Sequence, residues 1–182
     1  MKLTLLILFF CSTFVELQSK DLFNRKQSKV NSFGNTWDFV SDNVMGGLSE
    51  GQYQFLLQNN EKFYRLHGTV STENNGGFIQ LRSKINFSDS SYTGIKIKVR
   101  GDKGNYSLHF RTGYTILPWQ YYNFDFNVSD EWQVIKIPFK MFEKSHFFQP
   151  TNLTVNDLSS IAFVAIGLDF KAKLDISEAS FY

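Results

Sequence analysis

Residues 37–51 read WDFVSDNVMGGLSEG, and residues 69–78 read TVSTENNGGF. Each stretch places a glycine pair among Asn, Asp and Ser side chains, between two apolar runs. Glycine tolerates positive φ, and short polar side chains satisfy the main-chain amides that a tight corner leaves open. We therefore expect both stretches to be sharp turns that join strands, with successive glycines at positive φ. The glycines assigned to these turns are Gly46, Gly47, Gly51, Gly76 and Gly77.

Short runs on either side of these turns alternate between apolar and polar side chains in steps of two, which is typical of strands in a sheet with one wet face. The clearest run is IKIKVR at 95–100, where three apolar residues point one way and three cationic residues the other. Residues 138–147, PFKMFEKSHF, fit one short helical turn or an edge segment. Strands are expected at 54–57, 63–70, 78–85, 95–100, 107–111, 121–128, 132–137, 161–170 and 174–181.

Composition supports an all-β domain with little helix. Phe contributes 20 of the 182 residues, and aromatic residues favour strands. Nine strand candidates with turns between them indicate a β-sandwich or barrel. The domain is expected at 35–182, after a flexible lead-in at 20–34 that is polar and without period. The formal charge of +2 has both signs interspersed, which gives no basic face for nucleic acid or anionic lipid.

The first 19 residues, MKLTLLILFFCSTFVELQS, resemble a secretory signal peptide. They carry one basic residue, Lys2, then an apolar run over 3–15, and the small residue Ser19 where a peptidase cuts. The apolar run is too short for a permanent span of about 20 residues, so no stable membrane span is expected after cleavage; an uncleaved anchor is the alternative. Cys11, the sole cysteine, lies in this segment. A secreted or periplasmic location is predicted, without disulfides.

One constellation of residues carries a family resemblance. It comprises Trp37, Val40, Asp42, Val44, Met45, Gly46, Gly47, Ser49 and Gly51, followed by Gly68, Val70, Ser71, Glu73, Asn74, Asn75, Gly76, Gly77, Phe78 and Arg82. The chain thereby resembles the complex I intermediate-associated protein 30 family, whose mitochondrial members assist assembly of NADH:ubiquinone oxidoreductase. The resemblance implies a jelly-roll β-sandwich of the galactose-binding-domain type and a non-enzymatic role. It also implies a mitochondrial location as the alternative, which the secretory leader opposes.

No catalytic or metal site is predicted. Residues 47–51 match G-x-S-x-G, but a nucleophile elbow needs an apolar strand before Ser49 and a helix after it, and both are missing from the pattern. The three histidines form no H-x-H or H-x-x-x-H pair. Asp38, Asp42 and Glu50 remain possible oxygen ligands for a structural calcium ion, without EF-hand spacing. We expect a chain that is not an enzyme and needs no cofactor.

Two classes of function remain open. The first is a protein-interaction or assembly-factor module; its partner, by the resemblance, is a respiratory-complex assembly intermediate. The second is a carbohydrate-binding module, because sugar rings stack on aromatic side chains while their hydroxyls pair with Arg, Asn and Asp. The candidate binding residues are Asp42, Asn74, Asn75, Arg82, Arg111, Trp119, Gln120 and Tyr121, with Tyr122 beside them.

Each candidate also has a structural interpretation. Asn74 and Asn75 are typical turn formers, and Trp119 fits a core position equally well. Four N-x-S/T sequons would place their asparagines on the surface of a secreted eukaryotic protein. These asparagines are Asn86, Asn105, Asn127 and Asn152.

Overall fold

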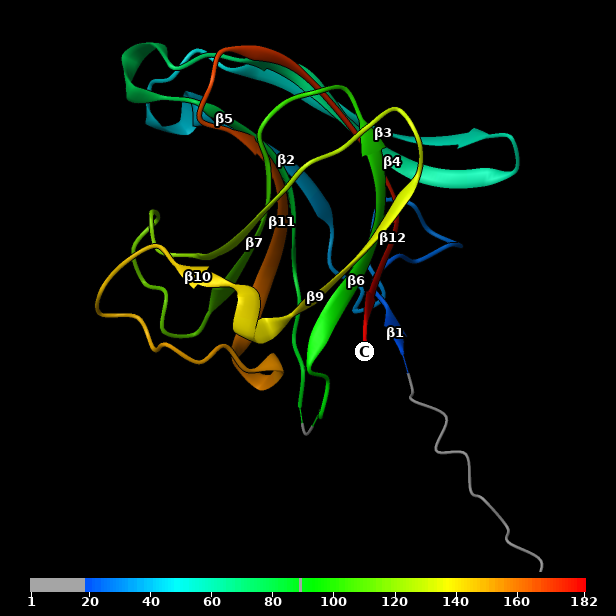
Figure 1. Cartoon of the computed structure of the whole chain (residues 1–182), viewed down its shortest axis with the longest axis vertical. Coiled ribbons are helices and arrows are strands. Elements are labelled where there is room, and N and C mark those ends of the chain that lie inside the picture. The colour runs from blue at the N-terminus through cyan, green and yellow to red at the C-terminus, as the bar shows by residue number, and fades with distance from the viewer. Residues whose placement is uncertain (1–18, 89) are drawn as a thin grey trace, which may run out of the picture.

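A computed structural model describes residues 19–88 and 90–182, which form two antiparallel sheets that pack as a sandwich (Figure 1). The β12 sheet has the order β3-β4-β12-β6-β9, with β1 paired to β12, and the β11 sheet has the order β10-β8-β7-β11-β5-β2. The strands are β1 (Lys20–Asp21), β2 (Trp37–Ser41), β3 (Glu50–Gln58), β4 (Glu61–Val70), β5 (Phe78–Lys84), β6 (Gly94–Gly101), β7 (Tyr106–Thr112), β8 (Tyr122–Phe126), β9 (Gln133–Pro138), β10 (Glu143–Lys144), β11 (Leu158–Ile166) and β12 (Phe170–Phe181).

Helical structure in the described residues is limited to four short 3₁₀ turns, as expected for an all-β domain. They are η1 (Asp42–Met45), η2 (Glu73–Asn75), η3 (Phe139–Met141) and η4 (Val155–Asp157). None of the helices in the described part of the chain is long and apolar enough to cross a membrane. The signal peptide expected at 1–19 lies outside the described residues, except for residue 19.

All nine strands expected from alternation are present. One boundary is wrong: the sequence predicts a single strand over 161–170, but β11 ends at Ile166 and β12 begins at Phe170. The chain reverses at Gly167, whose φ of 88° lies in the left-handed region that favours glycine. The segment 138–147 contains both features expected of it, because the turn η3 is followed by β10 at the edge of the β11 sheet.

The core lies between the two sheets and is rich in aromatic side chains. Tyr64 and Phe181 come from the β12 sheet, Phe110 and Phe163 from the β11 sheet, and all four are fully buried. The rings of Phe110 and Phe181 lie 6.1 Å apart across the sandwich. Burying each such side chain contributes about 1.5–3 kcal/mol, so the facing apolar rows hold the sheets together.

The sequence predicts a flexible lead-in over 20–34, and this prediction is wrong. Lys20–Asp21 forms β1 and pairs with the last residues of β12. Leu22 is fully buried in the core, and the Asn31 amide group donates to the Ser83 hydroxyl at 2.9 Å and to the Lys84 carbonyl at 2.6 Å. The segment packs because its apolar residues, although they lack a period, cover the rim of the sandwich.

Registers across the β11 sheet define its two ends. Ser41 at the end of β2 lies opposite Ile79 near the start of β5, and Phe78 lies opposite Ile166 at the end of β11. The loops after β2, before β5 and after β11 therefore meet at one end of the sheet. The loop after β7 (113–121) and the loop after β10 (145–153) lie at the other end (Figure 1).

Candidate functional site

The outward face of the β11 sheet carries a row of polar side chains. Leu108 and Phe110 of β7 point into the core, so His109, which lies between them in the strand, points outward. The row that crosses the sheet through this position runs Asp38, Arg82, Ala162, His109, Asn123 and Glu143, from β2 to β10. The middle of this row, Ala162 and His109, is buried. Polar side chains thus lie on both sides of a buried centre.

An aromatic stack lies on this face. The ring of Tyr121 is nearly parallel to that of His109, with centroids 4.0 Å apart and an angle of 8°. Burial lowers the pKa of His109 to about 4, against a smaller raising effect of Asp125, so the imidazole is neutral at neutral pH. Burial, and then Asp125, raise the pKa of Tyr121. Tyr121 is therefore neutral at neutral pH. Because it is only partly buried, its ring forms an uncharged platform on the surface.

Main-chain hydrogen bonds fix the position of Tyr121. Its amide donates to the Ser145 hydroxyl at 2.9 Å, and its carbonyl accepts from the Ser145 amide at 2.9 Å and from Gln149 Nε2 at 3.0 Å. The Ser145 hydroxyl also donates to the Trp119 carbonyl at 2.9 Å. These bonds tie the loops 113–121 and 145–153 together. We call these two loops the aromatic loop pair.

Arg111 and Gln120 build the first of these loops. The Arg111 guanidinium donates to the Thr115 carbonyl at 2.7 Å and to the Leu117 carbonyl at 3.0 Å. The buried Gln120 accepts from the Leu117 amide through Oε1 at 3.0 Å. Burial, and then the charge of Arg82, lower the pKa of Arg111. The Arg111 guanidinium and the Gln120 Oε1 atom therefore bind the main chain of the loop itself.

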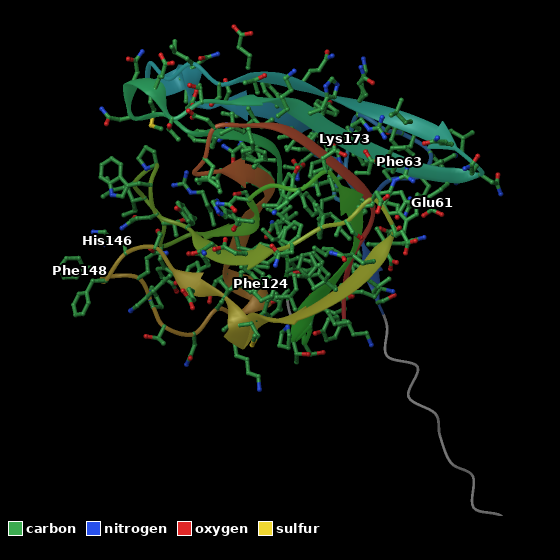
Figure 2. All side chains as sticks on the ribbon, turned by 45° about the horizontal axis from the view of Figure 1, so that its top comes forward. Glu61, Phe63, Phe124, His146, Phe148 and Lys173 are labelled. Atoms are coloured by element: carbon green, nitrogen blue, oxygen red, sulfur yellow. The ribbon has the colours of Figure 1, made fainter. Side chains whose placement is uncertain are left out.

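The aromatic loop pair exposes large apolar side chains. Trp119 is 58% exposed, so its core interpretation is wrong, and Phe148 is 83% exposed. Figure 2 shows Phe148 at the outer tip of its loop, pointing away from the sandwich. The other exposed apolar residues here are Tyr114, Ile116, Leu117 and Phe147. Large exposed apolar side chains gathered on loops mark interaction surfaces more often than single ones do.

The glycine-rich turns meet at the opposite end of the sheet around Asp42, which is fully buried. Its carboxylate accepts from the Ser49 amide at 2.9 Å, the Ser49 hydroxyl at 2.5 Å, the Phe78 amide at 3.1 Å and the Gly77 amide. Burial alone would raise the pKa of Asp42, but these hydrogen bonds outweigh burial and hold it below its usual value. We call this arrangement the glycine node.

The glycines of the node have two different tasks. Only Gly46 (φ 87°) and Gly77 (φ 125°) adopt positive φ, so the prediction of successive positive-φ glycines is wrong. The assignment of Gly51 to a turn is wrong too, because Gly51 lies in β3 and pairs with Gly68 of β4. A Cβ on Gly47 or Gly76 would instead collide with the carboxyl group of Asp42. One glycine of each pair therefore turns the chain, and the other leaves room for the carboxylate.

Asn74 and Asn75 are turn formers in this node, each with φ of 57°. Both are exposed, and the Asn74 amide group donates to the Gly46 carbonyl at 3.3 Å, which links the two glycine-rich turns. The structural interpretation of these asparagines is thus supported by geometry. Of the candidate binding residues, Asp42 belongs to the same node.

The candidate residues form two groups rather than one. Asp42, Asn74 and Asn75 lie in the glycine node. Arg82 lies four residues into β5 from Phe78, about 13 Å along a strand, and its charge, second to burial, lowers the pKa of Arg111. Arg111, Trp119, Gln120 and Tyr121 lie at the aromatic loop pair. Tyr122 points into the core and donates to the Pro150 carbonyl at 2.8 Å.

His109, Asn123 and Asp125 join the face although sequence reasoning missed them as site residues. Their signal was the alternation of β7 and β8, which places them on the side opposite Phe110 and Phe126. A small pocket of about 170 Å³ borders Asp125, at the end of the face where β7 begins.

All four sequon asparagines, 86, 105, 127 and 152, are exposed in loops.

The geometry at Ser49 opposes the hydrolase alternative. The Ser49 side chain is fully buried, and its hydroxyl donates to Asp42 and to the Ser71 carbonyl at 3.2 Å. Asp42 is not available as a calcium ligand, because its carboxylate already accepts hydrogen bonds from N–H and O–H donors. No group of three or more His, Cys, Asp or Glu side chains suited to a metal ion occurs in residues 19–88 and 90–182.

Comparisons with known proteins agree with the fold. A model of the complex I intermediate-associated protein 30 family matches residues 23–177. The family 11 carbohydrate-binding module of Clostridium thermocellum, solved with a β-1,3-1,4-mixed-linked tetrasaccharide, is similar with a TM-score of 0.67 and 13% identity, over 90% of this chain and 94% of that chain.

The family 30 carbohydrate-binding module of a Clostridium thermocellum cellulosomal cellulase is similar with a TM-score of 0.61 and 12% identity, over 91% of this chain and 98% of that chain. At these identities the likeness shows the jelly-roll fold alone. Among curated proteins, none matches.

Proposed function

The chain belongs to the complex I intermediate-associated protein 30 family, and from that premise we propose that it is a non-catalytic module that binds carbohydrate on the outward face of its β11 sheet. The observation that carries this proposal is the Tyr121 platform, stacked on His109 at 4.0 Å and fixed by main-chain hydrogen bonds. A fixed ring loses little conformational entropy when a sugar stacks on it.

The groups around the platform suit sugar hydroxyls. Asn123 and Arg82 lie in the same row of the sheet as His109, and Asp125 lies close enough to raise the pKa of Tyr121. Amide, guanidinium and carboxylate groups together offer donors and acceptors in fixed planes. Trp119, two residues before Tyr121 in the adjoining loop, is exposed and offers a second aromatic ring.

Calorimetric titration tests this proposal. The chain is titrated with soluble β-glucan, galactan and agarose oligosaccharides; the β-1,3-1,4-mixed-linked tetrasaccharide is included because a module of similar fold was solved with it. Tyr121→Ala keeps the main-chain bonds and removes the ring, so binding should weaken about two- to tenfold, since stacking contributes about 0.5–1.5 kcal/mol. Trp132→Ala, on the β12 sheet side, is the matched control and should bind as the wild type does. Equal affinity of Tyr121→Ala and wild type would refute the proposal, as would a panel in which no sugar binds.

A second candidate function is binding of a protein partner at the glycine node, in keeping with an assembly role. Val44 and Met45 are 72% and 61% exposed, and neither takes part in the hydrogen bonds around Asp42. The side chains of Val44 and Met45, in the glycine-rich segment that carries the family resemblance, thus contribute little to the core. The partner would be a respiratory-complex intermediate if the chain is mitochondrial, and an exported protein if residues 1–19 act as a signal peptide.

Cross-linking followed by mass spectrometry separates these functions. The double variant Val44→Ser, Met45→Ser should keep its stability and its sugar affinity, and should lose a defined cross-linked partner that the wild type recovers. Recovery of the same partner by both proteins would refute the second function. Mapping the mature N-terminus then decides between the secreted and mitochondrial settings.

A further inference from the structure

Strand β3 is an unprotected edge of the β12 sheet. It is the terminal strand in the order β3-β4-β12-β6-β9, and its nine residues pair with β4 only. Among the described residues, no main-chain hydrogen bond outside this ladder uses a group of β3. One row of its N–H and C=O groups therefore faces away from the sheet, ready to pair with another strand.

The other edge strands carry the usual protection against pairing, and β1, which pairs with β12 only, has just two residues. Strand β9 contains Lys136 and ends at Pro138; β2 is short, contains Asp38, and its first amide donates to the Lys29 carbonyl at 3.0 Å. Strand β10 has two residues, both charged. By contrast, the only charge of β3 is Glu50 at its first position, and the run GQYQFLLQNN from Gly51 to Asn60 has no charge and no proline. Charges, prolines and short length are what edge strands use to prevent association.

We propose that β3 pairs with β3 of a second copy of this chain, antiparallel and about a two-fold axis. A two-fold axis makes a strand its own partner, so each free N–H meets a C=O of the other copy. The uncharged run allows this approach without repulsion between like charges. Figure 1 shows the β3–β4 hairpin projecting beyond the rest of the sandwich, which leaves space beside it for a second molecule.

Side-chain patterning selects the register. With Phe55 opposite Phe55 of the second copy, Leu57 lies opposite Tyr53 on the inner side of the sheet, and Gln52 lies opposite Gln58 on the outer side. Leu57 is 64% exposed in the single chain, and this register gives it an aromatic neighbour. The pairing uses neither the Tyr121 platform nor the glycine node, so it stands independently of the proposed function.

Sedimentation equilibrium across a dilution series tests the pairing. The wild type should show a concentration-dependent dimer, and Leu57→Lys should raise the dimer dissociation constant by at least about tenfold, because each dimer gains two lysines at the seam. Leu168→Lys, at an apolar residue of comparable exposure in the loop between β11 and β12, is the control and should dimerise as the wild type does. Circular dichroism verifies that both variants are folded.

Hydrogen exchange supplies a second readout. Amides of residues 52–58 should exchange more slowly at concentrations where the dimer forms, and should lose that protection in Leu57→Lys. A wild type that stays monomeric throughout the series would overturn the proposal. So would a dimer that Leu57→Lys leaves intact, or an edge that pairs with a peptide but not with a second copy.

Discussion

The two ends of the β11 sheet hold their loops by opposite means. At the glycine node one buried carboxylate accepts four hydrogen bonds, and two glycines make room for it. At the aromatic loop pair, Ser145, Gln149 and Arg111 share the task through bonds to main-chain carbonyls. The node therefore depends on one residue, whereas the loop pair distributes its support and leaves large side chains exposed for binding.

Removal of the Asp42 carboxylate should have the largest effect. Asp42→Ala leaves the amides of Ser49, Gly77 and Phe78 without their buried acceptor, so the free energy of unfolding should fall by about 3–5 kcal/mol. Urea denaturation followed by fluorescence measures this change. Asp38→Ala, an exposed residue of the neighbouring strand, should change it by less than about 0.5 kcal/mol. A similar small loss for Asp42→Ala would show that the node is not the support of these turns.

Acidification should affect the two ends in different pH ranges. The pKa of His109 is about 4 in the folded chain, and its ordinary value is 6.5. Between these two pH values the unfolded chain therefore binds a proton at His109, whereas the folded chain does not. Stability should therefore fall by ~3 kcal/mol as the pH drops from 6.5 to 4. The pKa of Asp42 is lowered from 3.8, so its contribution should persist through this range and be lost only at more acidic pH.

The variant His109→Gln isolates the contribution of the loop-pair end. Its free energy of unfolding should depend less on pH between 6.5 and 4 than that of the wild type, because no buried imidazole remains there to refuse a proton. His67→Gln, on the β12 sheet, is the control and should retain the wild-type dependence. If His109→Gln and wild type give parallel curves, burial of His109 does not govern this pH range.

Alanine substitution of a glycine from each end gives the smallest contrast. A Cβ on Gly76 meets Asp42, whereas a Cβ on Gly113 in the aromatic loop pair meets nothing within 4 Å. Gly76→Ala should destabilise by about 1–3 kcal/mol through overpacking, and Gly113→Ala should be neutral or slightly stabilising. Thermal unfolding compares them. Equal losses would indicate that the space around Asp42 is not limiting.

Alternation along the sequence predicts most of this fold, because period-two patterning depends on each strand alone. The nine expected strands are present for that reason. Strands β1 and β10 have two residues each, too few for a period, and they exist only because a partner strand lies beside them. The sequence does not predict strand β2. The packing of Leu22 depends on a distant part of the chain, because β1 beside it pairs with the end of β12.

The candidate site was less accessible from the sequence. Gln120 and Arg111 read as free hydrogen-bonding groups, but their partners lie within their own loop. The bond between Ser145 and Trp119 joins residues 26 positions apart, so no local pattern reveals it. The sequence does not indicate His109 as a site residue, because its stacking on Tyr121 depends on the pairing of β7 with β8.

The most direct test of carbohydrate binding is nuclear magnetic resonance with a sugar from the panel. Chemical shift changes should cluster at His109, Tyr121, Asn123 and Arg82, and resonances of the glycine node should stay unchanged. Shift changes confined to the node or to the outward side of the β12 sheet would contradict the account, and so would spectra that no sugar alters.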